Sequence, residues 1–190
     1  MDSRAACPDF RKIPCVFDFQ PNLTGTLIKM RPMAEADFEA LYAVASDPLI
    51  WEIHPVPDRW QRPLFRAYIS EAFADRGGLV AIEAATGKIA GFSRYSQHFV
   101  GEEEIEIGWT FLSRAFWGGA HNRDMKRIML AHALAHFPRV IFRVGEANLR
   151  SRRAIEKING NPIPWNETGP ISGRKVVAFA ITREGFAAHF

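Results

Sequence analysis

A strand-like segment, a short run of small residues and a helix follow one another in the part of this sequence best suited to bind an anion. The small residues are Gly118, Gly119 and Ala120, after an alternating stretch that ends at Leu112. They let a ligand approach backbone N–H groups, and a helix N-terminus adds roughly half a positive charge. Arg123, Lys126 and Arg127 follow, where cations oppose the helix dipole unless an anion offsets them. The pattern favours a phosphate; the alternative is a tight turn beside a solvated basic face.

Two familiar phosphate-binding motifs do not fit this segment. A Walker A loop needs a lysine and a serine or threonine after its last glycine, and neither follows Gly119. The dinucleotide-binding fingerprint needs three glycines within a βαβ unit, whereas this segment follows a run of strands joined by short turns. Phosphate recognition here must therefore come from a different strand–turn–helix arrangement.

The spacing of apolar residues predicts the elements that position these groups. Apolar residues at helical spacing predict helices, and alternating residues predict strands, two of them joined by a turn at residues 85–88 (ATGK). The order predicts an α+β domain with a mixed, mostly antiparallel central sheet and about four flanking helices. The helices are predicted over residues 34–45, 63–74, 119–137 and 149–158, and the strands over residues 26–32, 79–84, 89–99, 103–112, 139–144 and 175–182.

Length and composition predict one globular domain. The chain has 190 residues, of which 47% are apolar and 24% charged, so it can bury a core without disulfides. No apolar run is long enough to span a bilayer, and no signal peptide is evident, so a cytoplasmic location is expected. Residues 1–22 are expected to form an irregular extension and residues 23–190 the domain. Cys7 and Cys15 are expected to be free thiols, because their spacing fits neither a zinc pair nor a redox pair.

The whole pattern resembles the GNAT N-acetyltransferases, and most closely their RimJ/RimL-like branch. The resemblance covers residues 25–182 and rests on four segments in order: GTLIKMRPM with its helix, EIEIGWTFLSRAFWGGAHNRDMKRIML, RVIFRV and EANLRSRRAIEKING. The family's pyrophosphate loop, Q/R-x-x-G-x-G/A, falls on residues 117–122. Ala120 and Asn122 depart from its small-residue rule.

The resemblance implies a binding site for acetyl-CoA and no metal. Backbone groups of Thr110, Phe111 and Leu112 would hold the pantetheine arm. Asn148 and Ser151 match a family N-x-x-S segment near the thiol end; the alternative for Asn148 is a helix N-cap. The pyrophosphate would lie on Trp117, Gly118, Gly119, Ala120, His121, Asn122 and Arg123.

Acetyl transfer to an amine needs a base for the amine and a proton for the leaving thiolate. Strict alternation would place Glu104 and Glu106 on one strand face with Gly108 and Thr110, and the apolar residues between them on the other. Glu106 is the candidate base, acting through water; the alternative is an ordinary solvent-facing carboxylate. Many GNAT enzymes use a tyrosine seven residues after the motif asparagine as the acid. Isoleucine occupies that position, 155, which leaves Ser151 or water as the candidate donor.

The loop between the first two predicted helices is where the family usually builds acceptor specificity. Trp51, His54 and Trp60 lie in this loop and are candidates for substrate binding, together with Glu104. The alternative for the tryptophans is packing in the core or at its rim. The expected acceptor is a primary amine, either a protein N-terminus or a small molecule.

Three functional classes remain open. The first is an N-acetyltransferase that works by direct transfer in a ternary complex, and the second is a non-catalytic module that binds or senses acyl-CoA. A nucleic-acid binder using Arg150, Arg152 and Arg153 ranks last, because three arginines on a short helix are usually a solvated face. The net charge of +3 is also small and dispersed. We therefore expect neither nucleic acid nor a membrane as a partner, and a homodimer is a further possibility.

Overall fold

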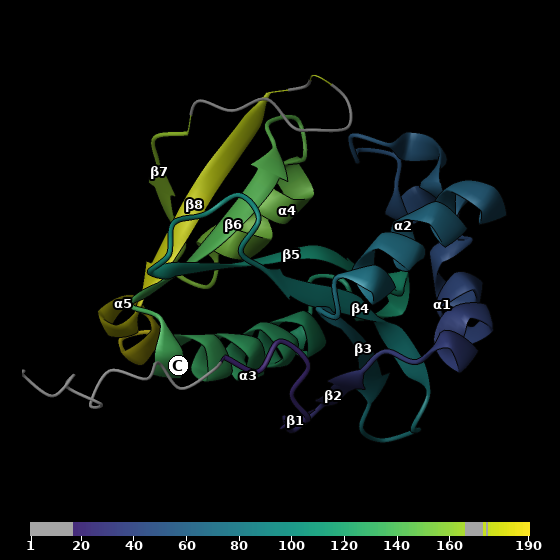
Figure 1. The fold of residues 1–190 in the computed structure, drawn as a ribbon, viewed down its shortest axis with the longest axis horizontal. Coiled ribbons are helices and arrows are strands. Elements are labelled where there is room, and N and C mark those ends of the chain that lie inside the picture. The colour runs from purple at the N-terminus through teal and green to yellow at the C-terminus, as the bar shows by residue number, and fades with distance from the viewer. Residues whose placement is uncertain (1–16, 166–172, 174) are drawn as a thin grey trace, which may run out of the picture.

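The computed structural model describes residues 17–165, 173 and 175–190, which form three layers with one sheet between two sets of helices (Figure 1). Among these residues the sheet has eight strands in the order β1-β2-β3-β4-β5-β6-β8-β7, and every neighbouring pair is antiparallel except β5 and β6. This confirms the expected α+β fold with a mixed, mostly antiparallel sheet. The strands are β1 (Leu23–Thr24), β2 (Ile28–Pro32), β3 (Gly78–Glu83), β4 (Ile89–Ser96), β5 (Glu104–Leu112), β6 (Arg139–Gly145), β7 (Asn161–Ile163) and β8 (Val176–Thr182).

Five α-helices flank the sheet in the described part of the chain, against about four expected. One face is covered by α1 (Phe38–Ala45) and α2 (Arg62–Ala74), and the other by α3 (Ala120–His136) and α4 (Leu149–Glu156). The short α5 (Arg183–Ala187), which the sequence pattern did not indicate, packs on α3. None of the described helices combines the length and the apolar character needed to cross a bilayer.

Each face of the sheet has its own apolar cluster. Under α1 and α2 the cluster is mainly aromatic and includes Phe65, Tyr68 and Phe111, with ring centroids 5.7 to 6.5 Å apart. Under α3 and α4 the cluster is mainly aliphatic and includes Met125 and Ile107. Burial of these side chains on both faces fixes the sheet between its helices.

Part of the expected N-terminal extension belongs to the core. Phe17 is buried, and its ring lies edge-on to Tyr95 at 5.2 Å and to Phe137 at 5.1 Å. The N–H and C=O groups of β1 pair with β2, so Leu23 faces Met30. Cys7 and Cys15 lie outside the described residues.

The expected strict alternation along the third meander strand is wrong beyond Gly108. Ile105 and Ile107 pack in the α3 cluster, but Phe111 packs in the α1–α2 cluster. The cause is Trp109, whose φ of 53° lies in the left-handed region and shifts the strand by one residue, as in a β-bulge. The Tyr68 hydroxyl donates a hydrogen bond to the Trp109 carbonyl and so holds the strained residue in place.

The bulge coincides with the point where β5 and β6 separate. The parallel pairing between these strands is three residues long, from Glu104 opposite Arg139 to Glu106 opposite Ile141. Beyond it β5 continues to Leu112 beside β4, and β6 continues to Gly145 beside β8. The sheet therefore opens in its middle, between the two helix layers.

Candidate active site

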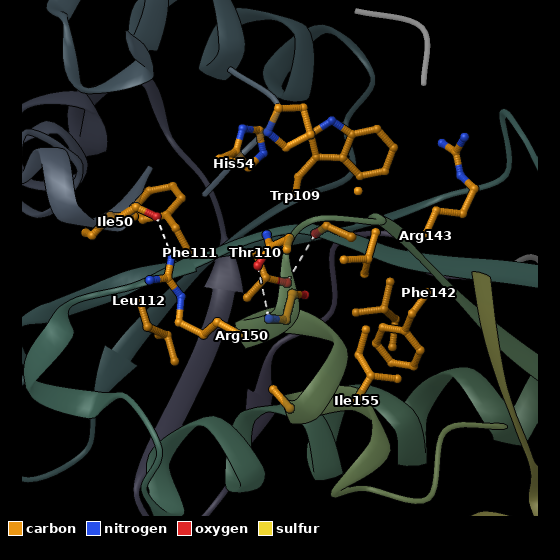
Figure 2. Close-up of a pocket in the computed structure, with 18 of the residues that line it drawn as sticks. Ile50, His54, Trp109, Thr110, Phe111, Leu112, Phe142, Arg143, Arg150 and Ile155 are labelled. Carbon is orange, nitrogen blue, oxygen red and sulfur yellow. Dashed lines mark hydrogen bonds between the residues drawn. The ribbon is translucent and has the colours of Figure 1, made fainter. Parts of the chain in front are cut away.

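A cavity of about 600 Å³ occupies the opening between β5 and β6 (Figure 2). Ile155 and Phe142 lie on its α4 side, and His54 and Trp109 lie on the opposite side. The structure brings most of the residues singled out from the sequence to this cavity. They are Trp51, His54, Glu106, Thr110, Phe111, Leu112, Trp117, Gly118, Asn122, Asn148 and Ser151.

Glu106 is a buried carboxylate, not a solvent-facing one. Its Oε2 accepts a hydrogen bond from Arg143 Nε at 3.0 Å, and both side chains are at least nine-tenths buried. Burial raises the pKa of Glu106, and the positive charge of Arg143 opposes this shift. The Arg143 guanidinium also packs on the Phe99 ring, with its central carbon 3.9 Å from the ring centroid. Glu106 thus presents a fixed, desolvated carboxylate to the cavity.

Glu104 does not line the cavity. Its carboxylate pairs with Arg139 of β6 and accepts the Gly101 N–H at 3.0 Å. The two glutamates, two residues apart on β5, therefore pair with two arginines, four residues apart on β6. Glu104 is the first residue of β5 that pairs with β6, and Glu106 is the last one before the two strands separate.

The glycine-rich segment forms a bend at one end of the cavity. Gly118 has a φ of +66°, which favours glycine, and Gly119 is the extended N-cap of α3. Its N-cap residue, Gly119, has no side chain to cap the helix, and no acidic residue lies in the first turn. The first backbone N–H groups of α3 are therefore left for another acceptor, which suits an anion.

The residues around the bend point in different directions. Trp117 donates its indole N–H to the Leu112 carbonyl at 3.0 Å, so that carbonyl already has a partner within the chain. His121 packs its ring on Phe116, with centroids 4.5 Å apart. Arg123 reaches the His189 carbonyl on the far side of α3 and does not line the cavity. Gly119 and Ala120 are likewise outside the lining.

The helix N-cap interpretation of Asn148 is confirmed. Its Oδ1 accepts the Ser151 N–H at 3.1 Å, at the first turn of α4. Both side chains also line the cavity. The two roles are compatible, because the cap uses one amide oxygen and leaves the amide N–H donors.

Two Asn148 variants separate these roles. Asn148→Ser keeps a capping oxygen, so we expect its unfolding free energy to change by a few tenths of a kcal/mol at most, whereas Asn148→Ala should lose about 1 kcal/mol. Urea unfolding measures both. Loss of acetyl-CoA affinity in the stable Asn148→Ser variant would show that the amide contacts the cofactor, and unchanged affinity would assign Asn148 to capping alone.

The predicted acceptor residues divide into core and surface. Trp51 is buried, donates its indole N–H to the Ala45 carbonyl at 2.7 Å and presents one part to the cavity. His54 lines the cavity, and its Nδ1 accepts the Val56 N–H at 3.0 Å. Trp60 is 36% exposed and lies outside the lining.

Two cavity residues had no place in the site expected from the sequence, and a third lies elsewhere in the site than expected. Arg59, in the short helix Pro57–Trp60, lies 4.1 Å from the Tyr68 ring centroid, and burial lowers its pKa. Arg143 is the partner of Glu106. Lys126 was expected beside the phosphate, but it is 6% exposed and donates from Nζ to Thr110 Oγ1 at 2.8 Å. It therefore lies between α3 and the middle of β5.

No cluster of three or more His, Cys, Asp or Glu side chains suited to a metal ion exists among the described residues. The cavity instead combines one carboxylate, several cations, hydroxyls and a bend with free backbone donors. These groups can bind a phosphorylated ligand at one end and take a proton from a second ligand at the other.

Comparison with protein families gives one clear match. The model of the acetyltransferase (GNAT) domain matches residues 28–160, more than half of the chain. No curated protein matches the sequence significantly.

Solved structures share the fold at low sequence identity. A probable GNAT-family acetyltransferase from Chromobacterium violaceum has a TM-score of 0.76 at 18% identity and covers 98% of both chains. A GCN5-related N-acetyltransferase from Brucella melitensis has a TM-score of 0.75 at 16% identity, covering 89% of this chain and 81% of that one. Mycobacterium smegmatis RimJ, solved with CoA-disulfide, has a TM-score of 0.66 at 17% identity and covers 87% of each chain.

Proposed function

The chain belongs to the GNAT acetyltransferase family, acetyl-CoA-dependent N-acetyltransferases, and from this premise we propose that it acetylates a primary amine by direct transfer in a ternary complex. The observation that carries the proposal is the cavity between β5 and β6. Both Gly118, in the bend, and the buried carboxylate residue Glu106 line this one cavity. Two substrates entering from different ends can therefore meet inside it.

In this proposal the pyrophosphate of acetyl-CoA lies on the bend at residues 117–123, against the N-terminus of α3. The positive φ of Gly118 and the uncapped first turn of α3 support this position. The pantetheine arm follows Thr110, Phe111 and Leu112 along the unpaired edge of β5. The Leu112 carbonyl already accepts the Trp117 indole, so the arm relies on other backbone groups of this edge.

We assign Glu106 as the general base, acting through water. Its burial, its position in the cavity and its raised pKa support this role, because a carboxylate with a raised pKa accepts a proton more readily. Arg143 holds the carboxylate in one orientation. Ser151 lies on the same wall as Asn148, where its hydroxyl would relay a proton to the departing thiolate.

We place the chain in the RimJ/RimL-like branch, with either a protein N-terminus or a small amine as the acceptor. The fold shared with RimJ and the aromatic loop around Trp51 and His54 support this assignment. We also infer a cytoplasmic enzyme that needs no metal, nucleic acid or membrane. A non-catalytic acyl-CoA sensor is the alternative, favoured by isoleucine at position 155, where many relatives have a catalytic tyrosine.

Calorimetric titration tests the cofactor first, with acetyl-CoA and CoA beside ATP and a short DNA duplex as controls. We expect micromolar or tighter binding of the two CoA compounds and none of the controls. Mass spectrometry of amines and peptides incubated with acetyl-CoA then separates the enzyme from the sensor. Tight binding without any acetylated product supports the sensor, and absence of binding contradicts both.

The bend itself is tested by Gly119→Leu. A Cβ at Gly119 would have the Trp117 carbonyl oxygen at 3.9 Å as its nearest neighbour, so the variant should fold, while its side chain fills the space assigned to the pyrophosphate. We expect the Kd for acetyl-CoA to rise at least about tenfold, the cost of about one lost charged hydrogen bond. Gly101→Leu, in the loop before β5, is the matched control and should bind normally. Unchanged affinity in Gly119→Leu would place the pyrophosphate elsewhere.

A further inference from the structure

Lys126 is a buried amine whose role is not explained by packing. It lies on α3, is 6% exposed and lines the cavity. Its Nζ donates to a neutral hydroxyl, Thr110 Oγ1, at 2.8 Å. Among the described residues no carboxylate lies within 4.0 Å of this nitrogen, so its charge has no counterion within the described part of the chain.

The surroundings of Lys126 make the charged form costly in the free protein. The Phe142 ring, with its centroid 5.2 Å from Nζ, offsets part of this cost by a cation–π contact, and the apolar side chains of Ile155 and Ile158 line the same cavity. Burial alone lowers the pKa of Lys126 to about 7. The other charged groups of the cavity make no resolved contribution to this shift; they are Arg59, Glu106, Arg143, Arg150 and Lys175.

The reaction creates a charge that Lys126 can neutralise. When the acceptor nitrogen bonds to the acetyl carbon, the carbon–sulfur bond breaks and its electron pair leaves with sulfur. Thr110, on the edge assigned to the pantetheine arm, is in contact with Lys126, while Asn148 and Ser151 line the same cavity from α4. Of the other titratable side chains here, burial raises the pKa of the Tyr68 hydroxyl above its ordinary value, and Glu106 is assigned to the amine.

We propose that the Lys126 ammonium contacts the sulfur of bound CoA and donates the proton that the departing thiolate takes up. This inference rests on the proposed function. Sulfur gains the proton, Lys126 becomes a neutral amine, and the proton lost by the acceptor leaves through Glu106 and water. Solvent reprotonates Lys126 after CoA departs, so the cycle yields the amide and CoA thiol. The Ser151 hydroxyl, with no acidic proton of its own near neutral pH, serves as a relay or a hydrogen-bond donor.

The contact is testable without an acceptor, by comparing CoA with desulfo-CoA, which lacks the sulfur. In the wild type we expect CoA to bind at least about tenfold more tightly, as a charge-assisted contact implies. In Lys126→Met the ratio should fall to about one, with the desulfo-CoA affinity unchanged. Lys29→Met, an exposed lysine on β2, is the matched control and should keep the wild-type ratio. Lys126→Gln repeats the measurement with a polar replacement.

Other results overturn the proposal in distinct ways. Equal weakening of CoA and desulfo-CoA by Lys126→Met would place the amine on the pantetheine arm instead of the sulfur. Unchanged affinities for both CoA and desulfo-CoA would remove Lys126 from the site. Failure of the wild type to bind either compound would overturn the proposed function and this inference together. Once an acceptor is known, the wild-type kcat should decrease as the pH rises and Lys126 loses its proton. The kcat of Lys126→Met should not show this decrease.

Discussion

Replacing Glu106 by glutamine is expected to lower turnover by about 100-fold or more while leaving the affinity for acetyl-CoA within about threefold. Glutamine has nearly the same shape and can still accept the hydrogen bond from Arg143 Nε, so the cavity should keep its form. It cannot accept a proton from the amine. Steady-state kinetics and calorimetry on the same preparation measure the two effects.

Glu104→Gln is the matched control for this prediction. It changes the same residue type on the same strand, but Glu104 pairs with Arg139 outside the cavity. We expect its turnover to stay close to wild type. If both variants lost turnover equally, or if Glu106→Gln lost turnover and stability together, Glu106 would be a structural ion-pair partner and not the base.

The pH dependence of turnover should also show that Glu106 is the base. The base acts when deprotonated, so turnover should fall as pH decreases through its pKa. Because burial raises the pKa of Glu106, this acid limb should lie above the ordinary glutamate value of about 4.3. The limb should disappear in Glu106→Gln, and a limb retained in that variant would belong to another group.

Lys126→Met is expected to stabilise the free protein by about 4 kcal/mol at pH 7. The unfolded chain binds the lysine proton up to its ordinary pKa of 10.5, whereas the folded protein releases it at about 7. Desolvation therefore opposes folding fully below pH 7, and the penalty shrinks as pH rises toward 10.5. The advantage of methionine should narrow to about 1 kcal/mol near pH 10.

Urea unfolding at pH 6, 7, 9 and 10 measures this difference. Lys29→Met, the exposed control, should show little change at any of these values. A stability gain that is constant with pH would come from better packing of the methionine, and it would contradict a buried lysine with a lowered pKa. A variant stabilised without the cofactor and weakened in its preference for CoA over desulfo-CoA would show that the lysine is kept for function at a cost to stability.

The alternation of apolar and polar residues was enough to predict the meander of β3, β4 and β5, because each strand has a buried face and the turn at residues 85–88 has glycine where φ is +70°. It could not predict β7, which has three residues including Pro162 and depends on β8 for its pairing. It also could not place the bulge at Trp109, since that residue is held in the left-handed region by Tyr68 from a different element.

Two site residues, Lys126 and Arg143, could have been found from the sequence pattern. Lys126 stands four and eight residues before Leu130 and Leu134, which are buried, so helical spacing puts it on the apolar stripe of α3. Arg139 and Arg143 share a strand face, as do Glu104 and Glu106, and their parallel pairing matches the charges. Which strands are neighbours had to be known before this match had any meaning, and local spacing does not give that information.

The short pairing between β5 and β6 also makes occupancy of the site measurable at the backbone. Beyond Glu106 and Ile141 the facing edges of these strands have no strand partner in the described sheet. Amide hydrogens on those edges should exchange rapidly with deuterated solvent in the free protein and slowly once a ligand lies between the strands. Peptides covering residues 105–113 and 141–146 would then report filling of the cavity for any acyl-CoA, with the outer edges of the sheet as an internal reference.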